Sequence, residues 1–184
     1  MIQQLDIVVF RWLNSWVGTS TFFDWAIRFR AVWFLYIVIA ALLLFFIFTL
    51  WIRFRDKRRR NLGLVVFAIF SALLARFAVT ELVRFIYNRP RPFEVLEEVR
   101  QIVEHTGGGS FPSGHATFAF AIAAAVSFYY PKTSILFFLA AFSVGLGRVA
   151  AGVHWPSDIL GAAAVGILTA WLLGKILKIK SATL

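Results

Sequence analysis

Three short stretches of this chain carry arginines and histidines at spacings that could bind and transfer a phosphoryl group. The first is "RFIYNRPRPF", in which Arg84 precedes Arg91 and the prolines around Arg91 end a helix and stiffen the chain. We expect Arg91 to fold back towards Arg84, because two planar guanidinium groups together suit the several oxygens of a phosphate. Alone, the pair is equally consistent with arginines that extend towards water from a helix end.

The second stretch, "SFPSGHATFAF", places polar and flexible residues at the start of an apolar helix. Ser113 is a favourable N-cap, and Gly114 lets another group approach the backbone closely. A helix start offers unpaired N–H groups and the positive end of the helix dipole, which together suit an anion. His115 follows, where it could give or take a proton beside that anion. A capped helix with an ordinary histidine would explain Ser113 but not the other two residues.

The third stretch, "GRVAAGVHWPSDILG", contains Arg148, His154 and Asp158. Pro156 fits the first turn of a helix and would hold Asp158 near His154. A carboxylate that accepts a hydrogen bond from one imidazole nitrogen fixes the tautomer and leaves the other nitrogen free as a nucleophile. A lone His–Asp pair is often structural, but here an arginine accompanies it.

Other polar residues give weaker indications. His105 in "VEHTGGGSF" is typical of an ordinary loop residue, although it could touch a substrate. Arg89 and Arg100 are further cations that could meet a second phosphate. The glycines after His105 lack the Lys-Ser/Thr of a nucleotide-binding P-loop. No carboxylate cluster is placed to hold a metal, so we expect neither a metal nor a cofactor.

The composition indicates the scaffold that positions these residues. Of the 184 residues, 60% are apolar, and the mean hydropathy of +0.79 favours an all-α polytopic membrane helix bundle over a soluble domain. The formal net charge of +10 does not indicate nucleic-acid binding, because the charges lie between and beside apolar segments. Without cysteine, disulfides and thiolate chemistry are excluded. We expect one domain over residues 1–184, with the motifs within about residues 60–178.

Five apolar stretches approach the roughly 20 residues that cross a bilayer. The third is the shortest, so its ends must lie near the membrane surfaces or be sheltered by neighbours. Residues 1–30, which include "LDIVVFRWLNSWV", predict a helix at the membrane surface better than a further span. They do not resemble a cleaved signal peptide, and we expect the N-terminus to be retained. The predicted spans are Ala31–Ile52, Leu62–Val83, His115–Tyr130, Ser134–Val153 and Ile159–Leu177.

Lysines and arginines indicate how these spans are oriented. The run "RFRDKRRR", Lys132 and the C-terminal lysines fall on one side if five spans alternate, and the positive-inside rule makes that side cytoplasmic. The three stretches described above then share the outer side, where the positive-inside rule predicts few arginines. Arginines gathered there indicate a bound anion.

Together the three stretches resemble the signature of the type 2 phosphatidic acid phosphatase (PAP2) superfamily. That superfamily includes membrane lipid phosphatases and the vanadium haloperoxidases. The signature is carried here by Arg84-x6-Arg91-Pro92, by Pro112-Ser113-Gly114-His115 and by Arg148-x5-His154-x3-Asp158.

The resemblance implies a metal-free mechanism on the outer face of the bacterial cell membrane. His154 would attack phosphorus and form a phosphohistidine, and Asp158 would orient it. His115 would protonate the leaving oxygen and then activate water. The phosphoryl oxygens would be held by Arg84, Arg91, Arg148 and the backbone N–H groups near Ser113 and Gly114.

Two positions depart from the pattern that the family usually shows, and a third departs from that of its small bacterial diphosphatases. Arg84 replaces the Lys that the family usually has. The positive charge is kept, but a compact ammonium group is exchanged for a planar guanidinium that can donate two parallel hydrogen bonds. Gly147 replaces a usual Ser, which removes one hydrogen bond worth about 1 kcal/mol. Gly114 stands where many small bacterial undecaprenyl-diphosphatases have Asp.

Those small diphosphatases are otherwise similar in length and in the "NRPRPF" and "SFPSGHATF" runs, which implies undecaprenyl diphosphate as the substrate. Phosphatidylglycerophosphate, phosphatidate and lipid A phosphatases share the same motifs and are alternatives. A non-catalytic lipid-binding protein would tolerate the loss of either histidine, yet both are present. Five spans without an internal repeat do not favour a transporter. The sequence does not indicate an oligomeric state.

Overall fold

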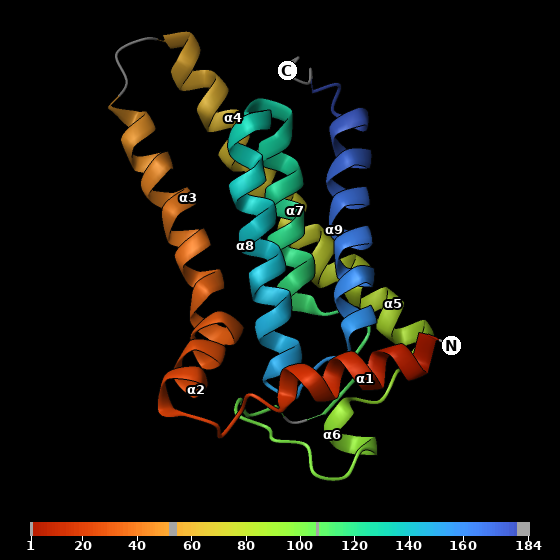
Figure 1. Cartoon of the computed structure of the whole chain (residues 1–184). Helices are drawn as coiled ribbons and strands as arrows, with labels where there is room; N and C mark the ends of the chain where they lie inside the picture. Colours follow the sequence, from red (N-terminus) through yellow and green to blue (C-terminus); the bar gives the residue numbers. More distant parts are fainter. Residues whose placement is uncertain (1, 52–54, 106, 180–184) are drawn as a thin grey trace.

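The computed structural model describes residues 2–51, 55–105 and 107–179, and within them the chain is all-helical, as predicted (Figure 1). Ile52, at the end of the first predicted span, lies outside the described residues. In chain order the elements are α1 (Ile2–Asn14), α2 (Thr21–Arg28), η1 (Phe29–Trp33), α3 (Phe34–Leu50), α4 (Arg55–Leu73), η2 (Leu74–Val79), α5 (Thr80–Ile86), α6 (Pro92–Val95), α7 (Gly114–Tyr129), α8 (Pro131–Ala150) and α9 (Pro156–Ile176).

Among the described residues, four helical stretches are long and apolar enough to cross a membrane, and α7 is a shorter apolar helix beside them. They correspond to the five predicted spans. The first runs from Thr21 to Leu50 and the second from Arg55 to Ile86, because the π-helical turns η1 and η2 continue the α-helices on either side. Both begin earlier than predicted. Ser20 caps the start of the stretch from Thr21 to Leu50 by accepting a hydrogen bond from the N–H of Phe23. The surface helix that we expected over residues 1–30 therefore ends before Ser20.

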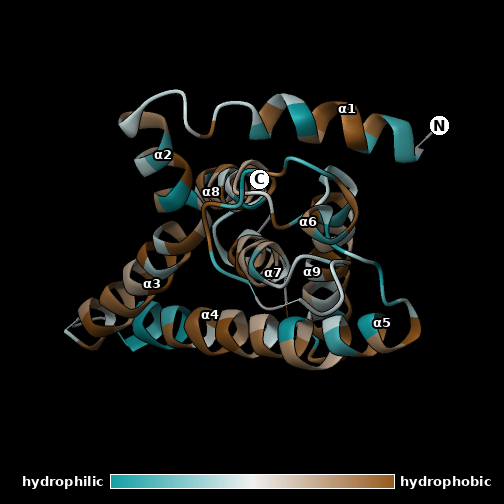
Figure 2. Ribbon diagram, turned by 90° about the horizontal axis from the view of Figure 1, so that it is seen from below, coloured by the Kyte–Doolittle hydropathy of each residue, from teal (hydrophilic) through white to brown (hydrophobic). Residues whose placement is uncertain are grey.

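The short helix α7 lies at the centre of the bundle and packs against α4, α8 and α9 (Figure 2). Alanines dominate its buried positions, and small side chains let neighbouring helices approach closely. On α9, a Cβ at Gly166 would lie 2.6 Å from the carbonyl oxygen of Thr117. The small residues therefore serve packing inside the bundle, and the neighbouring helices shelter the short span.

The first helix, α1, lies crosswise to the bundle over the ends of α8 and α9 (Figures 1 and 2). Its Asn14 amide donates to the carbonyls of Ala150 at 2.8 Å and Arg100 at 2.9 Å. Phe10 packs against Trp155 with ring centroids 5.5 Å apart. The opposite side of the helix exposes large apolar residues, which suits the predicted location at the membrane surface: Leu5, Val8 and Trp12.

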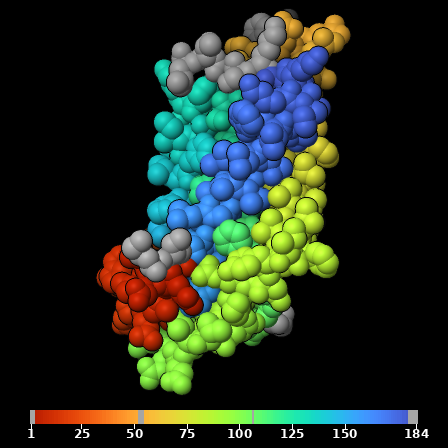
Figure 3. All heavy atoms as spheres, turned by 90° about the vertical axis from the view of Figure 1, so that its right-hand side faces the viewer, coloured from red at the N-terminus to blue at the C-terminus, as the bar shows by residue number. Residues whose placement is uncertain are grey.

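The two ends of the bundle are built from different parts of the chain. Figure 3 shows the N-terminal helix in red and the segment around residues 84–114 in yellow-green together at one end. The blue end of α9 lies at the other, as do the end of α3 and the start of α4 (Figure 1). All three motif stretches gather at the first end, and the basic start of α4 lies at the second. This arrangement agrees with the predicted separation of outer and inner sides.

Candidate active site

Arg91 is the most deeply buried arginine of the motif stretches, with 1% of its surface exposed. Its Nε donates to the carbonyl of Gly108 at 3.0 Å, Nη2 to Gly109 at 3.2 Å and Nη1 to Val153 at 2.8 Å. Nη1 also lies 3.3 Å from Nε2 of His154. Burial, followed by a neighbouring positive charge, lowers the pKa of Arg91 to about 10, so the group remains charged at neutral pH.

His154 lies at the junction of α8 and α9 and is also buried. Its Nδ1 is 3.3 Å from Oδ2 of Asp158, in the first turn of α9. That oxygen also accepts hydrogen bonds from the backbone N–H of Trp155 at 2.8 Å and from the Ser110 hydroxyl. Because an ionised carboxylate only accepts, Nδ1 of His154 carries the proton and Nε2 keeps its lone pair. Burial lowers the pKa of His154 to about 3, so the ring is neutral at neutral pH.

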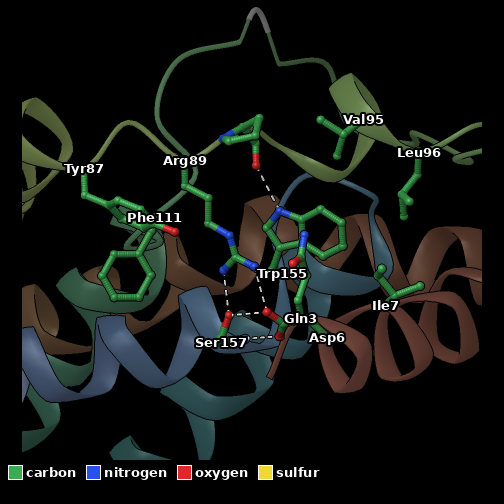
Figure 4. A pocket seen from close by; sticks show the side chains of 11 residues that line it. Gln3, Asp6, Ile7, Tyr87, Arg89, Val95, Leu96, Phe111, Trp155 and Ser157 are labelled. Carbon is green, nitrogen blue, oxygen red and sulfur yellow. Dashed lines mark hydrogen bonds and ion pairs between the residues drawn. The ribbon is translucent and has the colours of Figure 1, made fainter. Parts of the chain in front are cut away.

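The other oxygen of Asp158 is held by Arg89, at 2.8 Å from Nη1. Nη1 of Arg89 also donates to the Ser157 hydroxyl, and Nη2 forms an ion pair with the buried Asp6 of α1 at 2.7 Å. Asp6 in turn accepts from the N–H of Ser157 at 2.8 Å. The structure thus places Arg89 in ion pairs behind Asp158, and a contact between Arg89 and a second phosphate stays a prediction. Asp6, Arg89 and Ser157 of this network line a pocket of about 600 Å³ beside Trp155 (Figure 4).

Ser113 occupies the N-cap position of α7, as predicted, but its hydroxyl makes no capping hydrogen bond, so that part of the prediction is wrong. The N–H of Ser113 instead donates to the carbonyl of Asp158 at 3.2 Å, which fixes the start of α7 against α9. The Ser113 hydroxyl is fully buried and has no hydrogen-bond partner among the described residues. The first N–H groups of a helix have no intrahelical partner, so this uncapped start suits an anion.

Arg84 and Arg148 complete the arginine cluster. Each has a buried Nε without a hydrogen-bond partner in the part of the chain that the structure describes. Nη2 of Arg84 donates to the carbonyl of Pro112 at 3.0 Å, and Nη1 of Arg148 lies 3.4 Å from the carbonyl of Ala31. The charges of Arg91 and Arg84 both act on Arg148, which is 3% exposed. Buried donors left unpaired cost about 1–3 kcal/mol each, so the cluster suits an anionic ligand.

The departure at Gly147 has a structural explanation. A Cβ at this position would lie 2.7 Å from the backbone nitrogen of Ala31 and 2.7 Å from Cβ of Arg30. The π-helical segment η1 therefore occupies the space that a serine side chain would need. The close approach of η1 to α8 also brings the Ala31 carbonyl to Arg148.

The two other histidines both lie near the arginine cluster. His115, in the first turn of α7, is partly buried, and the charges of Arg148, Arg76 and Arg84 act on its imidazole. Burial, and then the charge of Arg91, lowers the pKa of the loop residue His105 to about 4. A contact between His105 and the substrate stays a prediction.

Arg100 takes no part in the cluster. Its Nη1 donates to the carbonyl oxygens of Val17 and, at 3.3 Å, of Ser15. It therefore holds the connection after α1 in place, and a contact between Arg100 and a second phosphate stays a prediction.

Arg76 on η2 was not identified from the sequence, although an arginine inside an apolar span was a usable signal. A Cβ at Gly114 would lie 2.4 Å from its Nε and 2.9 Å from its Cζ. The third departure thus also has a physical reason, because Arg76 fills the space beside Gly114.

The PAP2 superfamily model matches residues 65–180, which is more than half of the chain. The chain belongs to the PAP2 superfamily. This confirms the resemblance carried by the three motifs, and the protein is a multi-pass membrane phosphatase of the PAP2 type. Among the described residues, no group of three or more His, Asp or Glu side chains is placed to hold a metal ion.

Three relatives illustrate the range of the PAP2 phosphatases that this chain resembles. The "Bacitracin transport permease protein BcrC" of Bacillus licheniformis is 27% identical over 167 residues, 91% of this chain and 78% of the relative. "Undecaprenyl-diphosphatase BcrC" of Bacillus subtilis is 33% identical over 99 residues, 54% of this chain and 51% of the relative. "Lipid A 1-phosphatase" of Rhizobium johnstonii is 39% identical over 62 residues, 34% of this chain and 25% of the relative.

A solved structure resembles the PAP2 fold seen here over nearly its whole length. The crystal structure of Aquifex aeolicus LpxE superposes with a TM-score of 0.73 at 28% sequence identity. The match covers 93% of this chain and 95% of LpxE.

Proposed function

We propose that this protein hydrolyses undecaprenyl diphosphate to undecaprenyl phosphate and inorganic phosphate on the outer face of a bacterial cell membrane. The observation that carries the proposal is the neutral His154, whose Nε2 lies 3.3 Å from the buried guanidinium of Arg91. A nucleophile with a free lone pair beside buried cations suits attack on a phosphate. The relatives named undecaprenyl-diphosphatase support the choice of lipid.

In the first step, Nε2 of His154 forms a bond to the terminal phosphorus while the bond from phosphorus to the bridging oxygen breaks. Asp158 accepts a hydrogen bond from the Nδ1–H of His154 throughout and stabilises the positive charge that develops on the ring. The bridging oxygen leaves with the electron pair and takes a proton from His115. Arg84, Arg91, Arg148 and the start of α7 bind the phosphoryl oxygens as their charge redistributes.

In the second step, water attacks the phosphohistidine. His115, which has given up its proton, now accepts one from this water. The bond from phosphorus to Nε2 breaks, inorganic phosphate leaves, and His154 returns to its neutral state. Each residue thereby regains its starting protonation.

A second candidate is a lipid A phosphatase. The relative named "Lipid A 1-phosphatase" favours it with 39% identity, although over 62 residues. In that case the phosphate would be cut from a sugar, and the same histidines would act on it in the same order.

Phosphate release by the purified protein in detergent and EDTA tests both candidates. We would compare undecaprenyl diphosphate, lipid A, phosphatidylglycerophosphate and phosphatidate, using the wild type, His154→Ala, and Arg58→Gln as a control at the other end of the bundle. Release from undecaprenyl diphosphate that survives in EDTA and in Arg58→Gln, and is lost in His154→Ala, is the expected result. A higher kcat/KM on another lipid would replace the substrate assignment, and release that persists in His154→Ala would overturn the mechanism.

A further inference from the structure

Arg76 lies directly at the start of α7, beside the residues that the mechanism uses. Its Nε is 2.4 Å from the place that a Cβ at Gly114 would take, so the missing side chain is what admits the guanidinium. The neighbouring Ser113 hydroxyl is fully buried without a partner among the described residues. The helix start therefore carries a fourth arginine that the two-step mechanism leaves unused.

The position of Arg76 differs from that of the other site arginines. Its charge acts on His115 and on Arg84. The charges that act on His154 come instead from Arg148, Asp158 and Arg91. Arg76 thus lies on the side of the proton donor, which is the side of the leaving oxygen, and not on the side of the nucleophile.

A carboxylate already bridges Arg76 to the cluster. Glu81 accepts a hydrogen bond from Nη1 of Arg76 and another from Nη1 of Arg84 at 3.3 Å. The Glu81 side chain is 49% exposed and that of Arg76 is 27% exposed, so both are within reach of a ligand. An exposed ion pair is weak, and a phosphate with more charge and more oxygens can replace the carboxylate between two guanidinium groups.

We propose that Arg76 and Arg84 form a second anion subsite, which binds the phosphate that stays on the lipid when a diphosphate is cut. The inference rests on the proposed function, because it needs His154 on the terminal phosphorus and His115 at the bridging oxygen. When that bond breaks, the electron pair goes to the bridging oxygen, which belongs to the second phosphate. Arg76 stabilises the negative charge there and so favours diphosphates over monophosphates.

The test compares farnesyl diphosphate with farnesyl phosphate in detergent, which keeps the lipid constant. For Arg76→Gln, kcat/KM should fall about 10- to 100-fold on the diphosphate and less than about threefold on the monophosphate. Arg11→Gln, at the exposed end of α1, is the matched control for loss of one positive charge on the same face. It should leave the ratio of the two kcat/KM values unchanged.

A second variant covers the case in which Arg76→Gln does not fold. Glu81→Gln removes the competing carboxylate, and the KM for the diphosphate should fall about two- to fivefold with the monophosphate unchanged. Equal losses on both substrates, or no change on either in an active and folded variant, would overturn the subsite. Wild-type protein that releases phosphate from neither farnesyl substrate nor from undecaprenyl diphosphate would overturn the proposed function itself.

Discussion

Arginines gather at both ends of the helix bundle, but their surroundings differ. At the end predicted to be inner, Arg58 and Arg59 lie exposed on the first turns of α4. At the end predicted to be outer, Arg91 and Arg148 are 1% and 3% exposed and surround a neutral histidine. An exposed guanidinium keeps its hydration, whereas a buried one needs partners that replace water. Burial therefore distinguishes the arginines that are predicted to orient the protein from those that are proposed to bind a ligand.

The largest contrast is expected from removing one arginine at each end. Arg148→Gln should lower kcat/KM on the order of 1,000-fold, because a buried cation facing the phosphoryl group is lost. Arg58→Gln should change kcat/KM by less than about twofold. Initial rates of phosphate release in detergent measure both. Similar losses in the two variants would show that total charge, and not burial, accounts for the site.

The two acidic residues Asp158 and Asp56 offer the next contrast. Asp158→Asn should lower kcat/KM by about 100-fold, because an amide cannot accept from Arg89 and from Nδ1 of His154 at the same time. Asp56→Asn, in the first turn of α4, should change it by less than about twofold. Trapping of the phosphoenzyme by an alkaline denaturing quench, in which the P–N bond of a phosphohistidine survives, reports the loss directly. A full level of phosphoenzyme in Asp158→Asn would argue against its orienting role.

Two glycines test how tightly each end is packed. Gly147→Ala should destabilise the protein by about 1–3 kcal/mol, because the new Cβ would lie 2.7 Å from the backbone of Ala31. Gly63→Ala meets the end of the Tyr129 side chain at 3.3 Å, and gains helix propensity of up to about 1 kcal/mol. Thermal unfolding followed by tryptophan fluorescence compares them. The contrast fails if Gly147→Ala unfolds at the wild-type temperature.

Acid should weaken the outer end first, because all three histidines lie there. The pKa of His154 is about 3 in the folded protein and about 6.5 when unfolded. Between these values the unfolded chain binds a proton that the folded chain does not. Stability is therefore complete above about pH 6.5 and falls as the pH drops towards 3, by up to about 1.4 kcal/mol per pH unit.

Unfolding at pH 7 and pH 5 checks this expectation, with His154→Asn for comparison. The variant should lose less stability between the two pH values than the wild type, although His105, whose pKa is lowered to about 4, still contributes in the same direction. Equal losses in both proteins would mean that His154 binds a proton as readily in the folded state as in the unfolded one.

Much of the site was predictable, because its chemistry lies in three short stretches. The motif residues from Arg84 to Asp158 come together at one end of the bundle, as the alternation of spans requires. Local patterns also identified Pro156 in the first turn of α9 and the surface helix α1. These features depend on neighbours in sequence or on the direction of a span.

Features that depend on distant partners were missed. Ser110 and Asp6 are ordinary polar residues until the fold brings them to Asp158 and Arg89. The sequence identifies Arg89 as a cation but does not reveal which carboxylates it meets. Ser113 was expected to cap α7, but the start of that helix is set by a carbonyl of α9.

The contact between α1 and α9 has a consequence for how the site is assembled. Asp6 and its partner Ser157 lie 151 positions apart in the chain. Since Asp6 also binds the arginine that pairs with Asp158, the surroundings of Asp158 are complete only once α9 has been inserted against α1. A variant truncated before α9 should therefore lack phosphatase activity and leave α1 without its partner.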